Sequence, residues 1–413
     1  MAAHDSEQVL ELDVTNVAHG GVFVARHEGR VVFVADAIPG EKVRARVTEA
    51  KKSFWRAETL EVLEASPQRR EHVWEAASID RDPDERAGGA EFGHIELAHQ
   101  RELKRQVLAA ALGRFGRIEP PAFTVEAMPG DDDARGTGWR TRVRLHVDDA
   151  GAVGPYAARS HRVIPVAELP LALPRLVKAA PLCARVSAAS VDVVAPSTGD
   201  AFALAAGESR SPIVERVGDR DFTLEATGFW QVHKDAAATL SRAVKDAIDL
   251  ARVAAEAPNL DLYGGVGLLA AAFGDAVGAS ARITSVEADR AATGHARENL
   301  AEWANASAET ARVDRYLQRL VKTVDAAERR ALRDATVVLD PPRSGAGTQV
   351  VAQLAELAPA QIVYVACDPV ALSRDTGSLA EAGYALTGLR AFDLFPNTHH
   401  LEAVASFVPV ARG

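Results

Sequence analysis

The first sixty or so residues alternate apolar and polar positions in short runs, a pattern that predicts β-strands. The runs are VLELDV, GGVFVARHEG, RVVFVADAIPG, EKVRARVTEA and WRAETLEVLEA, between about residues 8 and 64. Turn residues separate them: His19-Gly20-Gly21, Glu28-Gly29 and Pro39-Gly40. Turns at this regular spacing are typical of a small all-β barrel. We assign residues 1–67 to such a barrel.

A second region, residues 68–224, begins with a helical pattern and continues with β-like runs. The stretch FGHIELAHQRELKRQVLAAALGRFG predicts a helix over about 93–116 that packs on the C-terminal domain. We interpret its charges Arg101, Lys104 and Arg105 as solubilising. The runs WRTRVRLHVDD, GAVGPYAARSHRVIPV, VDVVA and DFTLEAT follow. They predict a central α+β domain.

From residue 225 to 413, apolar β-rich runs alternate with Ala-rich helical segments. NLDLYG, ITSVEA, TVVLDPP and IVYVACDP are the four runs. Such alternation predicts an α/β fold with a doubly wound, Rossmann-like parallel sheet, in which ligands bind at the carboxyl ends of strands. Four chemically useful side chains lie at predicted strand ends: Asp261, Glu287, Asp340 and Cys367. Their equivalent placement is the main indication of function.

Composition indicates the class of protein and the cellular compartment. The 413 residues are 47% apolar and 25% charged, as in soluble globular proteins, and the net charge of -10 gives no sign of nucleic-acid binding by the whole molecule. Two cysteines exclude a disulfide framework and fit a reducing cytosol. No apolar stretch approaches the roughly twenty residues that span a bilayer. We expect a cytoplasmic monomer without a membrane partner.

The segment NLDLYGGVGLLAAA reads as a strand, a Gly-rich turn and a helix. Gly265 and Gly267 permit a tight turn and close approach of a ligand, and the Glu287 carboxylate, at the end of the next strand, can accept hydrogen bonds from ribose hydroxyls. The loop also satisfies the dinucleotide fingerprint. It therefore indicates a nucleoside cofactor without separating NAD from S-adenosylmethionine.

A thiol and two carboxylates beside a nucleoside cofactor suit methylation of a pyrimidine at C5. A thiolate that adds to C6 of uracil makes C5 nucleophilic, and a base must later remove the C5 proton. Cys367 would be the nucleophile, Glu402 the base, and Asp340 would orient the uracil or hold the cofactor. Cys183 is interpreted as a small buried hydrophobe. His399 and His400 are adjacent in a predicted strand and would face opposite ways, so we predict no metal site.

Five motifs resemble, in order, those of the RNA (uracil-5-)-methyltransferases that use S-adenosylmethionine. They are FWQVHKDAA, DLYGGVG, LDPPRSG, VACDP and FPNTHHLEAV, and the resemblance covers almost the whole chain. The N-terminal barrel resembles a TRAM domain, an RNA-binding module. The resemblance implies cofactor contacts from Gln231, Tyr263, Glu287, Asp314 and Asp340, with Cys367 as nucleophile and Glu402 as base. Asp261 and Gly265, in the strand and the Gly-rich turn described above, complete the predicted cofactor residues.

The chain departs from the family in several places. Many members hold an iron–sulfur cluster through a C-G-G-C motif, but here Ala87 and Ala90 stand where thiols would. Two cysteines cannot form a four-cysteine cluster, so we predict none. Asp368 replaces an Asn after the nucleophile and would raise the pKa of a neighbouring thiol. Asn397 replaces a His, and Leu268 a polar residue of some cofactor loops.

The run WRTRVRLHVDD predicts where RNA binds. Strand alternation places Arg140, Arg142, Arg144 and His146 on one face, which Arg159, His161 and Arg162 would extend. The alternative is a solvated face neutralised by acids such as those at 131–133.

Other functions remain open: cytosine C5 methylation, a non-catalytic RNA-binding protein that keeps the fold, and a dinucleotide oxidoreductase. The resemblance does not separate tRNA from 23S rRNA as the substrate.

Overall fold

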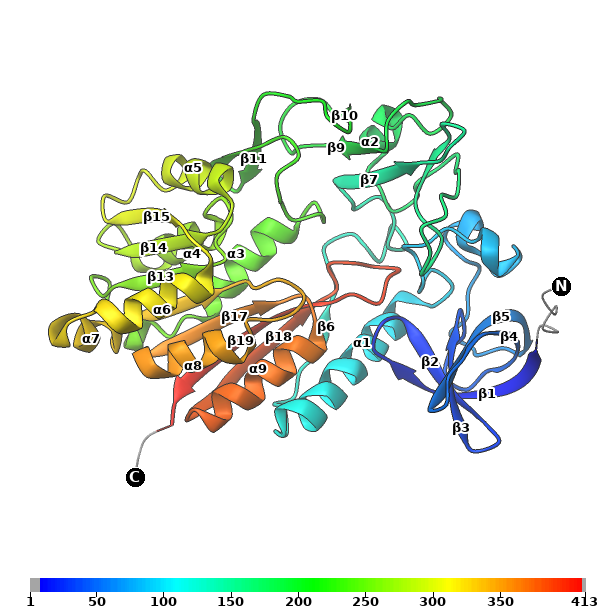
Figure 1. Ribbon diagram of the computed structural model, residues 1–413, viewed down its shortest axis with the longest axis horizontal. Helices are drawn as coiled ribbons and strands as arrows, with labels where there is room; N and C mark the ends of the chain where they lie inside the picture. The colour runs from blue at the N-terminus through cyan, green and yellow to red at the C-terminus, as the bar shows by residue number, and fades with distance from the viewer. Residues whose placement is uncertain (1–7, 411–413) are drawn as a thin grey trace.

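A computed structural model describes residues 8–410, and it begins with the predicted barrel (Figure 1). Five strands close on one another in the order β1-β2-β3-β5-β4. Alternation explains the closure: along β1, Leu10, Leu12 and Val14 are buried while the residues between them are exposed. The strands are β1 (Val9–Ala18), β2 (Val22–His27), β3 (Arg30–Ala35), β4 (Lys42–Ala50) and β5 (Phe54–Glu64).

Helix α1 (Leu97–Ala111) lies between the barrel and the C-terminal sheet, and a π-helical turn (Leu112–Gly116) extends it. Its Leu103 packs into the barrel core, whereas Leu108 and Leu112 pack against the sheet. The helix begins at Leu97, not near residue 93 as the pattern predicted. The Gln100 amide donates to the carbonyls of Phe92 and Ile95, which keeps that stretch out of the helix.

The central region holds a four-stranded sheet, a hairpin and one short helix. The sheet has the order β10-β9-β7-β8, with β7 (Arg142–Val147), β8 (Val153–Gly154), β9 (Ser190–Val194) and β10 (Phe202–Ala205). The hairpin pairs β11 (Ile213–Val217) with β12 (Arg220–Leu224), and the helix is α2 (Pro174–Ala179). The predicted strand over 151–166 is mostly irregular, because Pro155 and Pro165 have no N–H to donate to a ladder.

Eight strands form the C-terminal sheet, in the order β15-β14-β13-β16-β17-β19-β18-β6. The first five run parallel, and β19 is antiparallel to both neighbours. The four predicted apolar runs form β13, β14, β16 and β17. The strands are β6 (Val125–Glu126), β13 (Asn259–Leu262), β14 (Ile283–Glu287), β15 (Ala306–Thr310), β16 (Thr336–Leu339), β17 (Gln361–Ala366), β18 (Tyr384–Phe392) and β19 (Glu402–Pro409).

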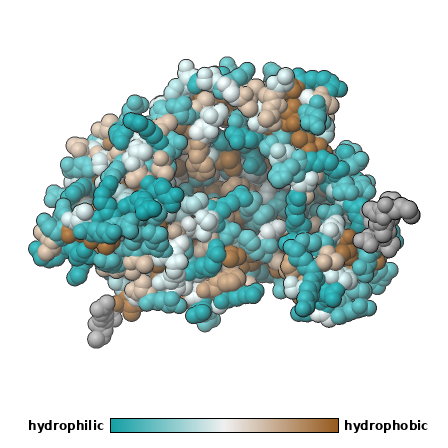
Figure 2. Space-filling view, viewed as in Figure 1, coloured by the Kyte–Doolittle hydropathy of each residue, from teal (hydrophilic) through white to brown (hydrophobic). Residues whose placement is uncertain are grey.

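Helices cover both faces of this sheet, which confirms the doubly wound α/β fold. One layer contains α3 (Ala236–Ala247), α4 (Leu268–Val277) and α5 (Arg290–Asn299). The other contains α1, α6 (Val313–Thr323), α7 (Ala326–Leu332), α8 (Gly347–Leu357) and α9 (Pro369–Glu381). Figure 2 shows a mostly hydrophilic face with scattered apolar patches. Within residues 8–410, no helix is long and apolar enough to cross a membrane.

Candidate active site

The two residues predicted to carry the chemistry, Cys367 and Glu402, lie opposite each other at the end of two paired strands. In the antiparallel pair β17–β19, Ala366 is the partner of Ala403. Cys367 and Glu402 come directly next to this pair, and the Glu402 charge acts on the Cys367 thiol. Directly opposed residues in such pairs have Cβ atoms about 4.5–5.5 Å apart. The fold therefore brings the sulfur and the carboxyl group together.

The thiol lines a cavity, so it is not walled off by the packing around it. The volume of this cavity is about 110 Å³, and the Cys367 side chain is partly exposed. The barrel, helix α1, the loop after Asp340 and the segment before Glu402 all contribute to its wall. The lining residues include His19, Lys104, Arg343, Asp368, His399 and His400.

Electrostatics around the cavity favour the neutral forms of its acids. Burial raises the pKa of the Cys367 thiol to about 12, and the charges of Glu402 and Asp340 add to the effect, while Arg343 opposes it. Burial and the Asp340 charge raise the pKa of Glu402 well above its ordinary value. A cation beside this cluster would favour the ionised forms.

The Gly-rich loop between β13 and α4 has the shape that a nucleoside cofactor needs. Gly265 and Gly267 have positive φ angles of 53° and 91°, and a Cβ placed on Gly265 would meet nothing within 4 Å. The Gly265 N–H donates to Glu287 Oε2 at 3.1 Å, and the other carboxylate oxygen accepts from the Asp289 N–H. Open space thus lies beside Gly265, next to the predicted ribose-binding carboxylate, whereas Gly267 packs against Leu300.

The carboxyl groups of the buried Asp261 and the half-buried Asp340 interact electrostatically. Asp261 lies inside β13 rather than at its end and accepts a hydrogen bond from Ser285 Oγ at 2.8 Å. Burial raises its pKa to about 7. Burial and the Asp261 charge likewise raise the pKa of Asp340 to about 7. The pair is therefore only partly ionised at neutral pH.

The remaining predicted cofactor residues lie on three separate segments. Tyr263 follows β13 directly, in the left-handed region with φ of 62°, and burial raises its pKa to about 12. Gln231 is half-buried in the loop between β12 and α3. Asp314 lies in the first turn of α6, where its hydrogen bond with Arg312, at 3.1 Å, lowers its pKa. That ion pair already engages the Asp314 carboxylate.

Comparisons with known proteins identify the family. A TRAM-domain model matches residues 7–60, and a tRNA (Uracil-5-)-methyltransferase model matches residues 187–407. An uncharacterized RNA methyltransferase of Streptomyces avermitilis is 36% identical, with 98% of this chain and 99% of the relative covered. The chain belongs to the tRNA (uracil-5-)-methyltransferase family. It is accordingly an S-adenosylmethionine-dependent RNA methyltransferase with an N-terminal TRAM domain, and its substrate is RNA.

Two further similarities agree with this membership. An uncharacterized RNA methyltransferase of Streptomyces coelicolor is 35% identical and covers 98% of this chain and 93% of its own length. Among solved structures, the Pyrococcus abyssi tRNA (uracil-54, C5)-methyltransferase in complex with S-adenosyl-L-homocysteine matches with a TM-score of 0.67 at 20% identity. That alignment covers 96% of this chain and 99% of the other, and it shows the shared fold.

Apolar packing occupies the stretch in which many family members place cluster cysteines. Ala87 and Ala90 are buried in a core that includes Trp74. Ion pairs then tie this stretch to the TRAM barrel, as between Arg86 Nη1 and Asp36 Oδ2 at 2.9 Å. The stretch is thus held by packing and ion pairs.

The predicted cationic face of the central strand is matched by carboxylates. Arg142 lies 3.4 Å from Glu215 and also donates to the Gly228 carbonyl. Arg144 makes a bidentate pair with Asp192 at 2.8 and 2.9 Å. The neutralising acids are therefore on β9 and β11, not at 131–133 as the sequence suggested. Asp131 is instead buried against His233, at 3.0 Å.

The other predicted RNA-binding residues, Arg140, Arg159 and His161, lie outside the strand that carries Arg142 and Arg144. Arg140 precedes β7, and the charges of Glu91 and Arg343, which lies at the Cys367 cavity, act on its half-buried guanidinium. Arg159 is exposed and feels the charge of Arg56 in the barrel. His161 is exposed and meets the ring of Tyr156 edge-on.

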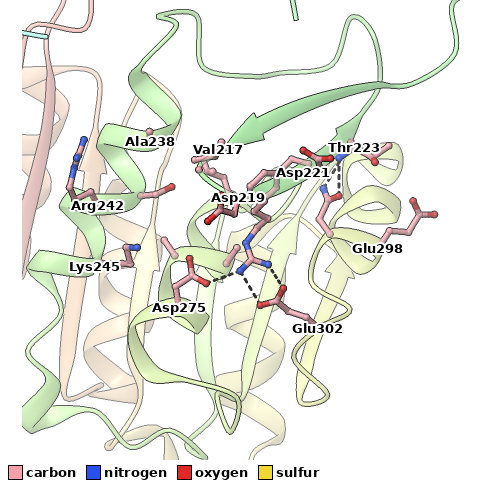
Figure 3. Close-up of a pocket in the computed structure, with 18 residues that line it drawn as sticks. Val217, Asp219, Asp221, Thr223, Ala238, Arg242, Lys245, Asp275, Glu298 and Glu302 are labelled. Atoms are coloured by element: carbon pink, nitrogen blue, oxygen red, sulfur yellow. Dashed lines mark hydrogen bonds and ion pairs between the residues drawn. The ribbon is translucent and has the colours of Figure 1, made fainter. Parts of the chain in front are cut away.

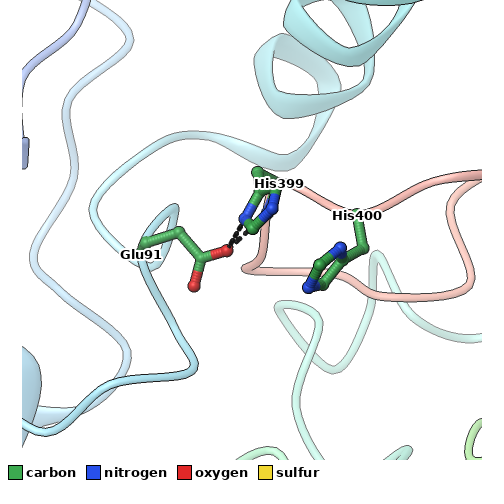
Figure 4. Close-up of side chains that lie close together, drawn as sticks. All are labelled: Glu91, His399 and His400. Carbon is green, nitrogen blue, oxygen red and sulfur yellow. Dashed lines mark hydrogen bonds and ion pairs between the residues drawn. The ribbon is translucent and has the colours of Figure 1, made fainter. Parts of the chain in front are cut away.

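Sequence reasoning missed a cluster of Glu91, His399 and His400 (Figure 4). The two histidines lie in a loop before β19, not in a strand, and their ring centroids are 3.9 Å apart. The stated reason for excluding a metal was therefore wrong, since ligand atoms of all three residues lie within 4.8 Å. Glu91 pairs with His399, however, and an Arg343 guanidinium nitrogen is 3.5 Å from His400 Nε2. This positive charge opposes a divalent cation, and no metal remains our prediction.

The same loop is anchored by a buried ion pair. Lys104 was interpreted as a solubilising charge, which is wrong: its side chain is fully buried, with Nζ 2.5 Å from Asp393 Oδ1 and 3.0 Å from the Phe395 carbonyl. Asn397, with φ of 65°, exchanges hydrogen bonds with Gln100 on the same helix. Helix α1 thereby fixes the loop beside the cavity.

A larger cleft, of about 950 Å³, lies between the β11–β12 hairpin and helices α3, α4 and α5 (Figure 3). Arg220 spans it and pairs with Asp275 at 2.7 Å and with Glu302 at 2.5 Å. None of the predicted site residues lines it. Because no predicted site residue reaches this cleft, we assign it no chemistry. Cys183, which we expected to be buried, is exposed, so that expectation was wrong.

Proposed function

We propose that this protein methylates C5 of a specific uridine in structured RNA, tRNA or 23S rRNA, through a transient bond between Cys367 and uracil C6. The observation that supports the proposal most is the register of β17 and β19, whose last pair, Ala366 and Ala403, is directly adjacent to Cys367 and Glu402. A thiol alone would suit many roles. A thiol that lines a cavity, with a buried carboxyl group close enough for its charge to act on the sulfur, suits addition and elimination on the pyrimidine of a flipped base.

Each residue then has one task. The Cys367 thiolate adds to C6, which makes C5 nucleophilic. When bound, S-adenosylmethionine supplies the electrophilic methyl group that C5 accepts. Glu402 removes the C5 proton, and the thiolate leaves. Because burial raises the pKa of Glu402, its carboxylate, once ionised, is a stronger base than that of an ordinary glutamate.

The cofactor would be held at the sheet edge described above. Glu287 would accept from the ribose hydroxyls, and the open space over Gly265 would admit the nucleoside. Tyr263, Gln231 and Asp314 would complete this pocket. Asp340 and Asp261 would lie near the sulfonium, since an ionised carboxylate attracts a cation.

RNA would reach the cavity across the barrel and the central sheet. Phe229, two residues before Gln231, is 75% exposed although it is a large apolar side chain. Exposed aromatic rings serve as stacking partners for unpaired bases. Arg140, Arg159 and His161 would contact phosphates, with smaller contributions from the paired Arg142 and Arg144.

Nucleoside analysis tests the assignment. Purified protein is incubated with S-adenosylmethionine and RNA from a strain that lacks this gene, and the digested RNA is examined by mass spectrometry. We expect 5-methyluridine from the wild type and from Cys183→Ala, the matched thiol control, and none from Cys367→Ala. Formation of 5-methylcytidine instead would assign cytosine as the target. Iron and sulfide analysis of the same preparation should find no cluster.

A further inference from the structure

The turn between β1 and β2 of the barrel reaches the loop that carries Cys367. His19 Nε2 lies 2.9 Å from Asp368 Oδ2, and the cavity at Cys367 is lined by Ala18, His19 and Gly20. A Cβ on Gly21 would be 2.8 Å from Glu91 Cγ, so the turn packs on the site without room for a side chain there. The barrel is therefore part of the wall of the reaction site.

Asp368 joins this turn to the helix that follows the nucleophile. Its Oδ1 accepts a hydrogen bond from the Ala371 N–H at 2.8 Å and caps α9, while its Oδ2 contacts His19. Cys367 lies between the last residue of β17 and this cap. The position of the sulfur thus depends on a strand on one side and on Asp368 on the other.

The contact between His19 and Asp368 also affects the charge around the Cys367 thiol. The groups whose charges act on the thiol are Glu402, Asp340 and Asp368, all acidic, and Arg343. An acidic neighbour disfavours the thiolate that the reaction needs. Family members with Asn at this place lack the Asp368 charge. The imidazole of His19 is the group placed to offset it here, and His399 is the other ring near it, at a centroid distance of 6.5 Å.

We propose that His19 is a positioning residue for methyl transfer: it holds Asp368 and, when protonated, offsets the carboxylate beside Cys367. The inference rests on the proposed function of Cys367. It gives the TRAM barrel a part in the chemical step in addition to RNA binding. It also accounts for an acidic residue next to a nucleophile that must ionise.

A double-mutant cycle on His19 and Asp368 tests this role. Single-turnover methyl transfer at saturating RNA, and the RNA KM, are measured near pH 7 for wild type, His19→Ala, Asp368→Asn and the double variant. Loss of one partner of an exposed pair predicts that His19→Ala slows the chemical step about two- to fivefold with little change in KM. With Asp368→Asn in place, His19→Ala should change the rate little.

Two controls separate positioning from general damage to the fold. His27→Ala removes another barrel histidine, one that packs on Trp55, and should leave the rate unchanged. His19→Gln keeps an N–H donor without the charge and should lie between wild type and His19→Ala.

Two results would overturn the inference while methylation itself stands. One is a change confined to the RNA KM, which would make the turn an RNA contact. The other is equal effects of His19→Ala in both backgrounds. A wild-type protein that transfers no methyl group would instead remove the proposed function, and this role with it.

Discussion

Replacing Lys104 by Met should destabilise the protein strongly, because it leaves one charge of a buried pair alone. The side chains of Lys104 and Asp393 are 0% and 1% exposed, and Asp393 Oδ2 has no other partner among the described residues. Met has a similar length, so the change removes the charge with little loss of packing. Breaking a buried ion pair from one side typically costs about 3–5 kcal/mol of unfolding free energy.

The compensating variant makes the prediction specific. In Lys104→Met/Asp393→Asn no charge remains buried, so most of the lost stability should return, because removing both charges is far less costly than removing one. Urea unfolding followed by circular dichroism measures the effect, with Lys42→Met, at an exposed pair with Glu11, as the control expected to change nothing. A single variant within about 1 kcal/mol of wild type, or a double variant as unstable as the single, would refute the reasoning.

Three further predictions concern ligands. Asp340, whose pKa is about 7, is mostly protonated at pH 6 and ionised at pH 8, so S-adenosylmethionine, a cation, should bind about fivefold or more tightly at pH 8 by calorimetry. Equal affinity at both pH values would contradict this, and Asp340→Asn should weaken the pH dependence. Phe229→Ala should weaken RNA binding about tenfold in a filter assay without changing stability, whereas Leu250→Ala, also at an exposed apolar residue, should not. Arg159→Ala should reduce RNA affinity and its salt dependence more than Arg144→Ala, because Asp192 already neutralises Arg144; the reverse order would be evidence against this surface.

The sequence predicted the elements whose side chains are buried most uniformly. All described side chains of β16 and β17 are buried. Their sequences are therefore continuous apolar, β-branched runs, which predict strands. Strand β15 was missed because its sequence, ASAET, has few strand-forming residues and lies at the sheet edge, where one side is open. Strand β18 was missed too, since Gly388 and a register shift interrupt its alternation.

The candidate site was predictable only where motifs carried it. The proximity of Cys367 and Glu402 depends on strand register, which no local pattern specifies, although the sequence placed Cys367 at a strand end and Glu402 in the last of the five motifs. Contacts between distant segments had no local signal. Lys104 resembled any helix-surface lysine until the fold set Asp393 beside it. His399 and His400 were misjudged because a loop was taken for a strand, and the contact of His19 with Asp368 spans nearly the whole chain.

Trapping the covalent intermediate tests the account most directly. With Glu402→Gln, the C5 proton stays in place and the sulfur cannot leave, so RNA should remain bonded to the protein. We predict an SDS-resistant RNA–protein band that requires S-adenosylmethionine and disappears in Cys367→Ala/Glu402→Gln. Absence of that band, together with methyl transfer by Cys367→Ala, would contradict the mechanism.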